Sequence, residues 1–308
     1  MTEPLQDGTE PTQDVSGPLP GGTEPPTLLA AAVTPMTPGG SAVDLDAVAP
    51  MVAFLESHGV DGVLAGGTTG EGILLDVAER RALTQAFREA MSGTLIVHAG
   101  AQTTAESVAV ATHAAEVGVD GVAVIAPPYF RLDETALTAH FVAAARACAP
   151  LPFYCYTFAA RSGYAIPVEV VRRVSEATDN LAGLKVSESP WSAVEPYLGL
   201  GIPVLIGNEP LLPAGLKAGA AGAISGVAAA FPEIVRRVLD NPWGDDVEAL
   251  QRLRAALDAS GQFIAAVKYA LERRGVPVQP DVRAPLRLLN DEEIAAVDRT
   301  ISMRIRPS

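Results

Sequence analysis

The chain has 308 residues, of which 48% are hydrophobic and 19% charged, a balance typical of a folded globular protein rather than a disordered one. Its net charge of −14 argues against nucleic acid or an anionic membrane surface as a partner. No apolar run approaches the roughly 20 residues of a membrane-spanning helix. The two cysteines, Cys148 and Cys155, have neither metal-ligand nor redox spacing, so we expect no metal site and a reducing, cytoplasmic location.

Residues 1–27 differ in composition from the rest of the chain. They contain six prolines and five acidic residues but no Lys or Arg. Such a segment cannot bury enough apolar surface to offset the entropy that it would lose on ordering. It also lacks the basic start and apolar centre of a signal peptide. We expect a disordered acidic tail that takes no part in catalysis.

From residue 28 onward, short apolar runs alternate with longer amphipathic segments. Strands are expected at 28–33, 62–65, 95–99, 121–125, 152–156, 181–185, 203–206 and 221–225. Helices are expected to start near residues 44, 76, 104 and 133 and to cover 168–177, 191–198, 210–218 and 231–239. Nearly continuous apolar strands indicate burial on both faces, as in a parallel sheet covered by helices.

Eight strand–helix units predict an α/β protein with a (β/α)8 TIM barrel over residues 28–240. Residues 241–308 are expected to form a helical extension packed on the barrel, with helical segments at 247–273 and 291–302. A doubly wound sheet is the alternative, but it would need a second domain to account for eight regular repeats.

Lys185 stands at the end of the sixth expected strand and is one of three lysines in the chain. Loss of hydration at the mouth of a buried strand favours the neutral amine, which is a nucleophile. Alternatively, the side chain reaches water along its own stem and has no chemical role. Strand alternation places Gly183 on the face of Lys185, where it should leave space, and Tyr156 on the neighbouring strand. An amine beside a proton-carrying phenol suits imine chemistry.

The loop at residues 66–72 follows the second expected strand and holds Thr68 and Thr69 between glycines. Hydroxyls and free N–H groups there can bind a carboxylate, although a flexible turn is the plainer interpretation. The absence of a Walker lysine argues against nucleotide binding. Other expected strand ends carry polar or aromatic residues, and barrel enzymes place their chemistry at this rim: Thr34, His98, Tyr129, Asn208 and Ser225.

The chain resembles the dihydrodipicolinate synthase and N-acetylneuraminate lyase family in three segments: GTTGE (67–71), FYCYT (153–157) and GLKVSES (183–189). The resemblance extends over essentially the whole body, from residue 32 to residue 289. It implies a class I aldolase or lyase that acts on pyruvate or a related 2-oxo acid and an aldehyde, without a cofactor. It also implies a homo-oligomer, a dimer or a tetramer built from tight dimers.

The resemblance assigns roles to individual residues of the first half of the reaction. Lys185 matches the lysine that forms the Schiff base, and Tyr156 matches the tyrosine that carries protons. Thr68 and Thr69 match the residues that hold the pyruvate carboxylate. The resemblance implies a catalytic role for Thr69 as well.

The second half of the site resembles the family less closely. Arg161 matches the arginine that binds the carboxylate of the second substrate, and Ile224 matches a substrate-site position whose backbone lies near the lysine. The synthases usually have Asn-Val-Pro-Ser before that arginine, whereas this chain has residues 157–160, Thr-Phe-Ala-Ala. A tyrosine pair in the synthases reads Tyr129-Phe130 here, and a phenylalanine cannot pass a proton. Synthesis of dihydrodipicolinate itself is therefore in doubt.

Several alternatives stay open at the level of sequence. A sugar-acid (2-keto-3-deoxy acid) aldolase or dehydratase of the same family is as plausible as the synthase. The alternative outside the enzymes is a non-catalytic barrel that senses a ligand. A phosphate-binding barrel could use Gly219 and Gly222 but lacks an arginine clamp. A metal-dependent aldolase is disfavoured because the four histidines show no ligand spacing: His58, His98, His113 and His140.

Overall fold

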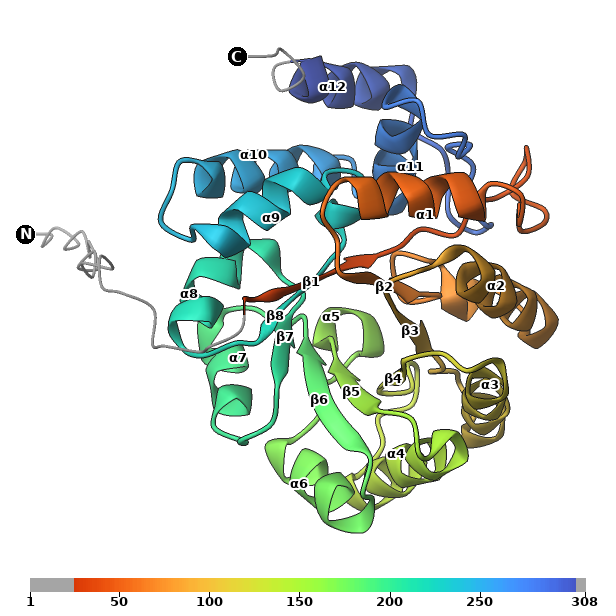
Figure 1. The fold of residues 1–308 in the computed structure, drawn as a ribbon, viewed down its shortest axis with the longest axis vertical. Coiled ribbons are helices and arrows are strands. Elements are labelled where there is room, and N and C mark those ends of the chain that lie inside the picture. Colours follow the sequence, from red (N-terminus) through yellow and green to blue (C-terminus); the bar gives the residue numbers. More distant parts are fainter. Residues whose placement is uncertain (1–24, 303–308) are drawn as a thin grey trace, which may run out of the picture.

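The structure is a computed structural model that describes residues 25–302. Eight parallel strands close into a barrel in chain order, and helices surround it (Figure 1). The strands are β1 (Thr27–Ala31), β2 (Gly62–Ala65), β3 (Thr94–His98), β4 (Gly121–Ile125), β5 (Phe153–Thr157), β6 (Leu181–Val186), β7 (Val204–Ile206) and β8 (Gly222–Ser225). The predicted TIM barrel is confirmed, and each expected strand coincides with an observed one to within two residues.

The helices of the barrel lie between the strands, on its outside, except for the short α5, which lies over the barrel opening and lines the cavity there. They are α1 (Val48–Ser57), α2 (Val77–Ala90), α3 (Thr104–Val117), α4 (Glu134–Cys148), α5 (Ala159–Ser162), α6 (Val168–Ala177), α7 (Trp191–Leu198), α8 (Leu212–Lys217) and α9 (Pro232–Asp240). Single 3-10 turns are η1 (Gly72–Leu74), η2 (Glu209–Leu211) and η3 (Val227–Ala229). Asp76, Thr103 and Asp133 cap α2, α3 and α4 by accepting hydrogen bonds from the first turn, which fixes where these helices begin.

The interior of the barrel is filled by inward-facing side chains of alternate strand positions. They form one buried cluster, against which Tyr154 packs: Leu29, Ala31, Leu64, Ile96, Ala123, Leu205 and Ile224. A side-chain carbon added at Gly183 would lie 3.1 Å from the Tyr154 ring. The space expected below Lys185 is therefore occupied, because the aromatic ring reaches across from the neighbouring strand.

The C-terminal extension differs from its prediction in one respect. Residues 247–273 were expected to be helical throughout, but they belong to two helices, α10 (Asp246–Asp258) and α11 (Phe263–Arg273). The chain between them contains Gly261 with φ +69, a left-handed conformation that ends a helix. Helix α12 (Asp291–Ser302) lies where it was expected. The extension packs beside α9 and α1 (Figure 1).

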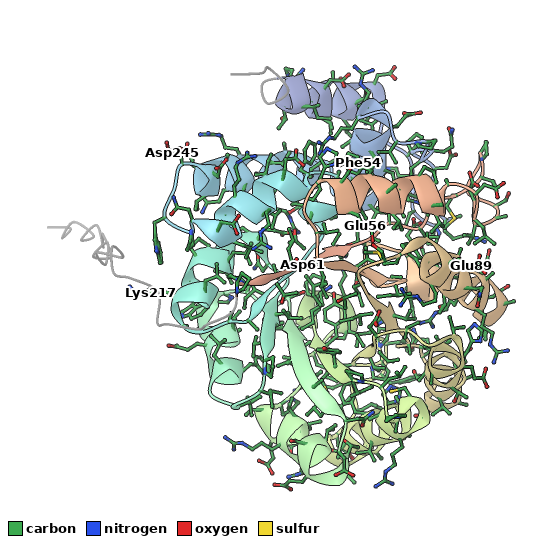
Figure 2. The ribbon with its side chains drawn as sticks, viewed as in Figure 1. Phe54, Glu56, Asp61, Glu89, Lys217 and Asp245 are labelled. Carbon is green, nitrogen blue, oxygen red and sulfur yellow. The ribbon has the colours of Figure 1, made fainter. Side chains whose placement is uncertain are left out.

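The described part of the expected N-terminal tail is short. Strand β1 already begins at Thr27, and residues 1–24 of the tail lie outside the described residues. On the surface, charged side chains such as Glu89, Lys217 and Asp245 point outward (Figure 2). Within residues 25–302, no helix has both the length and the apolar character needed to cross a membrane.

Candidate active site

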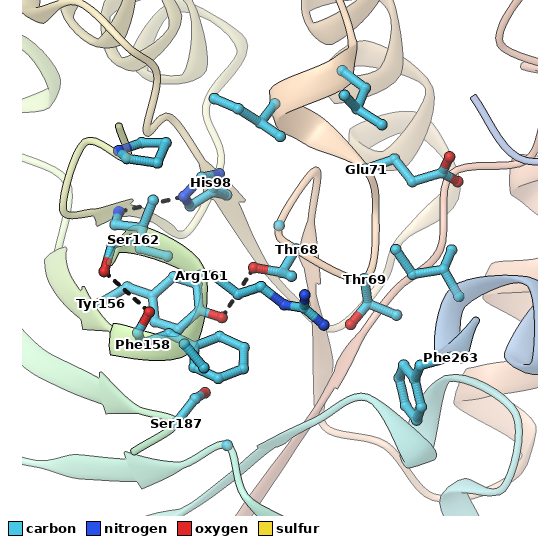
Figure 3. A pocket seen from close by; sticks show the side chains of 18 of the residues that line it. Thr68, Thr69, Glu71, His98, Tyr156, Phe158, Arg161, Ser162, Ser187 and Phe263 are labelled. Carbon is cyan, nitrogen blue, oxygen red and sulfur yellow. Dashed lines mark hydrogen bonds between the residues drawn. The ribbon is translucent and has the colours of Figure 1, made fainter. Parts of the chain in front are cut away.

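A cavity of about 720 Å³ opens at the carboxyl ends of the strands (Figure 3). Its walls come from the loop after β2, the ends of β5 and β6, and residues 261–265 of the C-terminal extension. Parallel strands that point the same way bring their last residues to one rim, which is why side chains distant in sequence meet here. Five of the six predicted site residues line this cavity: Thr68, Thr69, Tyr156, Arg161 and Lys185.

Lys185 is the fifth residue of β6 and is 3% exposed. Burial lowers the pKa of its ammonium to about 7, and the carboxylate of Glu209 opposes this only in part. Its Nζ atom lies 4.2 Å from the centroid of the Tyr156 ring. At neutral pH, a large share of Lys185 is therefore a neutral amine at the floor of the cavity.

Tyr156 is paired with Lys185 in the register of β5 and β6. Its hydroxyl lies 3.1 Å from the hydroxyl of Thr68, and the two share a hydrogen bond (Figure 3). Burial raises the pKa of the phenol to about 12, while hydrogen bonds from Thr68 and Ser187 oppose the shift. The phenol is therefore protonated at neutral pH and can exchange a proton with the hydroxyl beside it.

The loop that carries Thr68 and Thr69 is held by residues that come before it in the chain and by residues that come after it. Thr34 donates a hydrogen bond of 2.5 Å to the Gly70 carbonyl, so this predicted rim residue supports the loop rather than lining the cavity. After the threonines, Glu71 has φ +56 and is fully buried. The loop is therefore a fixed structure, and its threonine hydroxyls are presented to the cavity without the freedom of an ordinary turn.

Glu71 is bound by the C-terminal extension. Its Oε1 accepts a hydrogen bond of 2.5 Å from Lys268, and its Oε2 accepts one of 2.7 Å from the backbone N–H of Arg283. Lys268 also donates to the carbonyl of Asp281 at 2.7 Å. An ion pair with no exposed side-chain surface thus joins the threonine loop to α11, 197 residues along the chain.

His98 is buried and lines the cavity, and both of its ring nitrogens have partners. Its Nδ1 lies 3.1 Å from the Gly66 carbonyl, and its Nε2 lies 3.3 Å from the N–H of Ile125. Burial, together with the charges of Arg80 and Lys185, lowers the pKa of the ring to about 3. A neutral ring that donates from Nδ1 and accepts at Nε2 satisfies both contacts. Among the described residues, no three His, Cys, Asp or Glu side chains are grouped as metal ligands.

Ile224 and the aromatic pair lie away from the cavity. The Ile224 side chain packs in the barrel interior and is not part of the cavity lining, so a role in substrate binding would have to come from its backbone and stays a prediction. Tyr129, expected at the rim, is 86% exposed, and Phe130 beside it is 71% exposed. Their rings pack edge to face at 4.9 Å between centroids. Neither ring contributes to the site of the single chain.

Sequence reasoning missed the contribution of α10 and α11. Glu209, the first residue of η2, accepts hydrogen bonds from Ser225 at 2.7 Å and from Arg254 at 2.5 Å. Burial would raise the pKa of this carboxyl, but Arg254 and the hydrogen bonds outweigh it and lower the pKa. The Arg254 guanidinium in turn lies over the Phe263 ring, 4.5 Å from its centroid. No local pattern marks these residues, because they meet only in the folded barrel.

The sequence model of the dihydrodipicolinate synthetase family matches residues 24–304. The chain belongs to this family. A DapA-like lyase of uncharacterised function from Halobacterium salinarum is 38% identical over 275 residues, which cover 84% of this chain and 88% of that protein. The 4-hydroxy-tetrahydrodipicolinate synthase 1 of Streptomyces coelicolor is 35% identical over 281 residues, with coverage of 87% and 90%.

A solved structure shows the same architecture. The N-acetylneuraminate lyase of Proteus mirabilis superimposes with a TM-score of 0.80 at 26% identity, over 90% of this chain and 98% of that one. As a member of the dihydrodipicolinate synthetase family, the chain is a lyase of the lysine Schiff-base type. The family resemblance and the enzyme class predicted from the sequence are confirmed, and the non-catalytic alternative falls away.

Proposed function

We propose that this member of the family is an aldolase or lyase in which Lys185 forms a Schiff base with pyruvate or a related 2-oxo acid. The observation that carries the proposal is the buried Lys185 amine, with a pKa lowered to about 7, against the ring of Tyr156. A neutral amine in a water-poor site is the nucleophile that attack on a ketone requires.

The reaction begins with attack of Lys185 Nζ on the keto carbon. A proton then passes from the nitrogen to the former keto oxygen, and a second protonation lets that oxygen leave as water and gives the iminium ion. Tyr156, with its hydroxyl 3.1 Å from that of Thr68, is the group that carries these protons. Loss of a C3 proton from the iminium gives the enamine, whose C3 attacks the aldehyde; cleavage runs through the same steps in reverse.

The carboxylate of the 2-oxo acid binds at the threonine loop. Thr68 and Thr69 both line the cavity, and the loop is fixed at Gly70 and Glu71. Hydroxyl and backbone N–H donors suit a carboxylate, and a fixed loop aims the keto carbon at the amine. No cofactor is needed, because the iminium itself accepts the electrons of the bond that breaks.

Two acceptor classes remain for the second half of the reaction. Arg161 lines the cavity, which favours an aldehyde with its own carboxylate, as in 4-hydroxy-tetrahydrodipicolinate synthase. A sugar-acid aldolase or dehydratase is the second candidate, because uncharged hydrogen-bonding side chains also line this half: Gln102, Ser187, Asn208 and Gln262. A comparison of kcat/KM for aspartate 4-semialdehyde and D-glyceraldehyde, each with pyruvate, separates the two candidates.

Borohydride trapping tests the common step. Incubation with pyruvate and sodium borohydride should add one reduced pyruvate unit to the intact protein, and peptide mapping should place it on Lys185. The Lys185→Met variant should take up none, and Lys217→Met, at an exposed position on α8, should behave as the wild type. Absence of an adduct with pyruvate and with other short 2-oxo acids would refute the Schiff-base proposal.

The same family membership supports a homo-oligomer, a dimer or tetramer, in a reducing cytoplasm; both cysteines are free and buried. Tyr129 and Phe130 are 86% and 71% exposed, and paired aromatic rings in water are typical of a contact surface. We place them in a subunit interface. Sedimentation velocity should show an oligomer for the wild type and a smaller species for the double variant Tyr129→Ser/Phe130→Ser. A monomeric wild type would refute this assignment.

A further inference from the structure

Glu188 is a buried carboxylate in the wall of the cavity; it lies within the segment GLKVSES, but no role has been assigned to it and the proposed mechanism does not use it. It follows β6 three residues after Lys185 and is 4% exposed. Its Oε1 accepts a hydrogen bond of 2.5 Å from the Thr157 hydroxyl. The Ala159 N–H donates to both carboxylate oxygens, at 3.0 and 3.2 Å. These donors are neutral, so the carboxylate is held by hydrogen bonds rather than by a paired cation.

The groups that bind Glu188 belong to one turn. Thr157 is the last residue of β5, and Ala159 is the first residue of α5, the short helix that contains Arg161. The Thr157 oxygen also accepts a hydrogen bond of 3.1 Å from the N–H of Ile166, which closes the turn at its far end. On the other side, Asn208 donates to the Glu188 carbonyl at 3.2 Å. Glu188 is thus fixed itself, and it fixes the turn.

Arg161 depends on this turn for its position. It is exposed, and its guanidinium lies 5.8 Å from the Phe158 ring of the same turn. In Figure 3 its side chain extends from the turn toward Thr68 and Thr69. A long, exposed side chain has many rotamers, so the place of its charge depends on the backbone that carries it.

We propose that Glu188 is the positioning residue of the acceptor half of the site. Through Thr157 and Ala159 it fixes the turn at residues 157–162, and so determines where the Arg161 guanidinium meets the second substrate. This inference rests on the proposed function, because it concerns the substrate that reacts with the enamine. It assigns no proton transfer to Glu188.

Three variants test the role of Glu188 without removing a group of the proposed chemistry. Glu188→Gln keeps the shape but can no longer accept from Ala159 with both oxygens. Thr157→Val keeps the shape of that side chain and removes both its donor to Glu188 and its acceptor for the Ile166 N–H. Ala159→Pro removes the N–H: proline is tolerated at the first position of a helix, and Phe158 before it is not helical, with φ −157 and ψ 81. Glu195→Gln, exposed on α7, is the matched control.

The measurements separate the two halves of the reaction. Borohydride trapping and exchange of the pyruvate C3 protons into D2O report the donor half. The KM of whichever aldehyde the wild type uses best, aspartate 4-semialdehyde or D-glyceraldehyde, reports the acceptor half. Each variant should leave trapping and exchange within about twofold of wild type and raise the acceptor KM on the order of tenfold, as loss of a hydrogen bond to a charged group predicts.

The Glu188→Gln and Thr157→Val effects should also fail to add in the double variant, because both weaken the hydrogen bonds by which Glu188 fixes the same turn. Unchanged acceptor KM in Glu188→Gln and Ala159→Pro, with a wild-type adduct on Lys185, overturns this inference alone. Equal losses of trapping and acceptor use also overturn it, since Glu188 would then support the whole site. A wild-type protein without an adduct refutes the proposed function instead. If Glu188→Gln does not fold, Ala159→Pro and Thr157→Val still decide the question.

Discussion

Replacing Lys268 by methionine tests whether the C-terminal extension is part of the active site. Methionine keeps the length of the side chain but removes the ammonium that binds Glu71 at 2.5 Å. The Glu71 carboxylate, fully buried, would keep only the Arg283 N–H at 2.7 Å. Removal of one member of a buried pair costs about 3–5 kcal/mol. Urea denaturation should show a loss of this size in the free energy of unfolding, with the slope unchanged.

The same variant should weaken pyruvate binding. Glu71 stands two residues after Thr69 and has φ +56, a conformation that a non-glycine residue adopts at a cost unless its surroundings hold it. Without Lys268 the loop relaxes, so the KM for pyruvate should rise while acceptor preference stays the same. The double variant Glu71→Gln/Lys268→Met, which buries no charge, should recover most of the lost stability. A single-variant cost below about 1 kcal/mol, or no recovery in the double variant, would refute this account.

Three further outcomes follow from the pKa shifts and contacts of the site. The rate of borohydride trapping should rise through pH 7 and then level off, because the pKa of Lys185 is about 7 and the neutral amine is the nucleophile; an inflection near 10 would contradict burial as the cause. Glu209→Gln should move that inflection to lower pH, since the Glu209 carboxylate raises the pKa of Lys185. Glu176→Gln, at an exposed position on α6, should leave it in place. Tyr156→Phe should slow borohydride trapping, followed by stopped flow, by about 10²–10⁴-fold, and Thr68→Val should slow it by less. Equal trapping rates for Tyr156→Phe and the wild type would show that Tyr156 takes no part in proton transfer.

The barrel and the centre of the site could be predicted because both depend on short-range pattern. Buried strands read as apolar runs, and strand alternation together with parallel order brings Tyr156 beside Lys185. The helix break at Gly261 was missed because the apolar pattern continues on both sides of it, although glycine is a common stop signal. The prediction of an open space at Gly183 was wrong for another reason. Strand alternation predicts which face of the sheet a residue occupies, but it does not predict how far the Tyr154 ring reaches from the neighbouring strand.

Contacts between distant segments could not be predicted in this way. Glu71 is the last residue of GTTGE, yet nothing nearby in the sequence indicates that Lys268 binds it. Glu188 lies within GLKVSES, but its hydrogen bonds to Thr157 depend on the pairing of β5 with β6. One departure from the family pattern pointed to this contact: the synthases usually have a proline where this chain has Ala159. An alanine there supplies a backbone N–H, which a proline lacks, and this N–H binds Glu188.

The charges around the cavity explain why Lys185 stays a nucleophile. A carboxylate paired directly with its ammonium would hold the proton and raise the pKa. Over residues 25–302, no carboxylate forms a salt bridge with Lys185, and its pKa is instead governed by burial. The acid that does raise it, Glu209, is bound by Arg254 at 2.5 Å, so much of its field is compensated. Arg254, on α10 of the C-terminal extension, compensates the charge of Glu209 without contacting Lys185. The Lys185 amine can therefore be buried and still be reactive. The extension therefore acts on the chemistry at both ends of the cavity, at Glu209 through Arg254 and at Glu71 through Lys268.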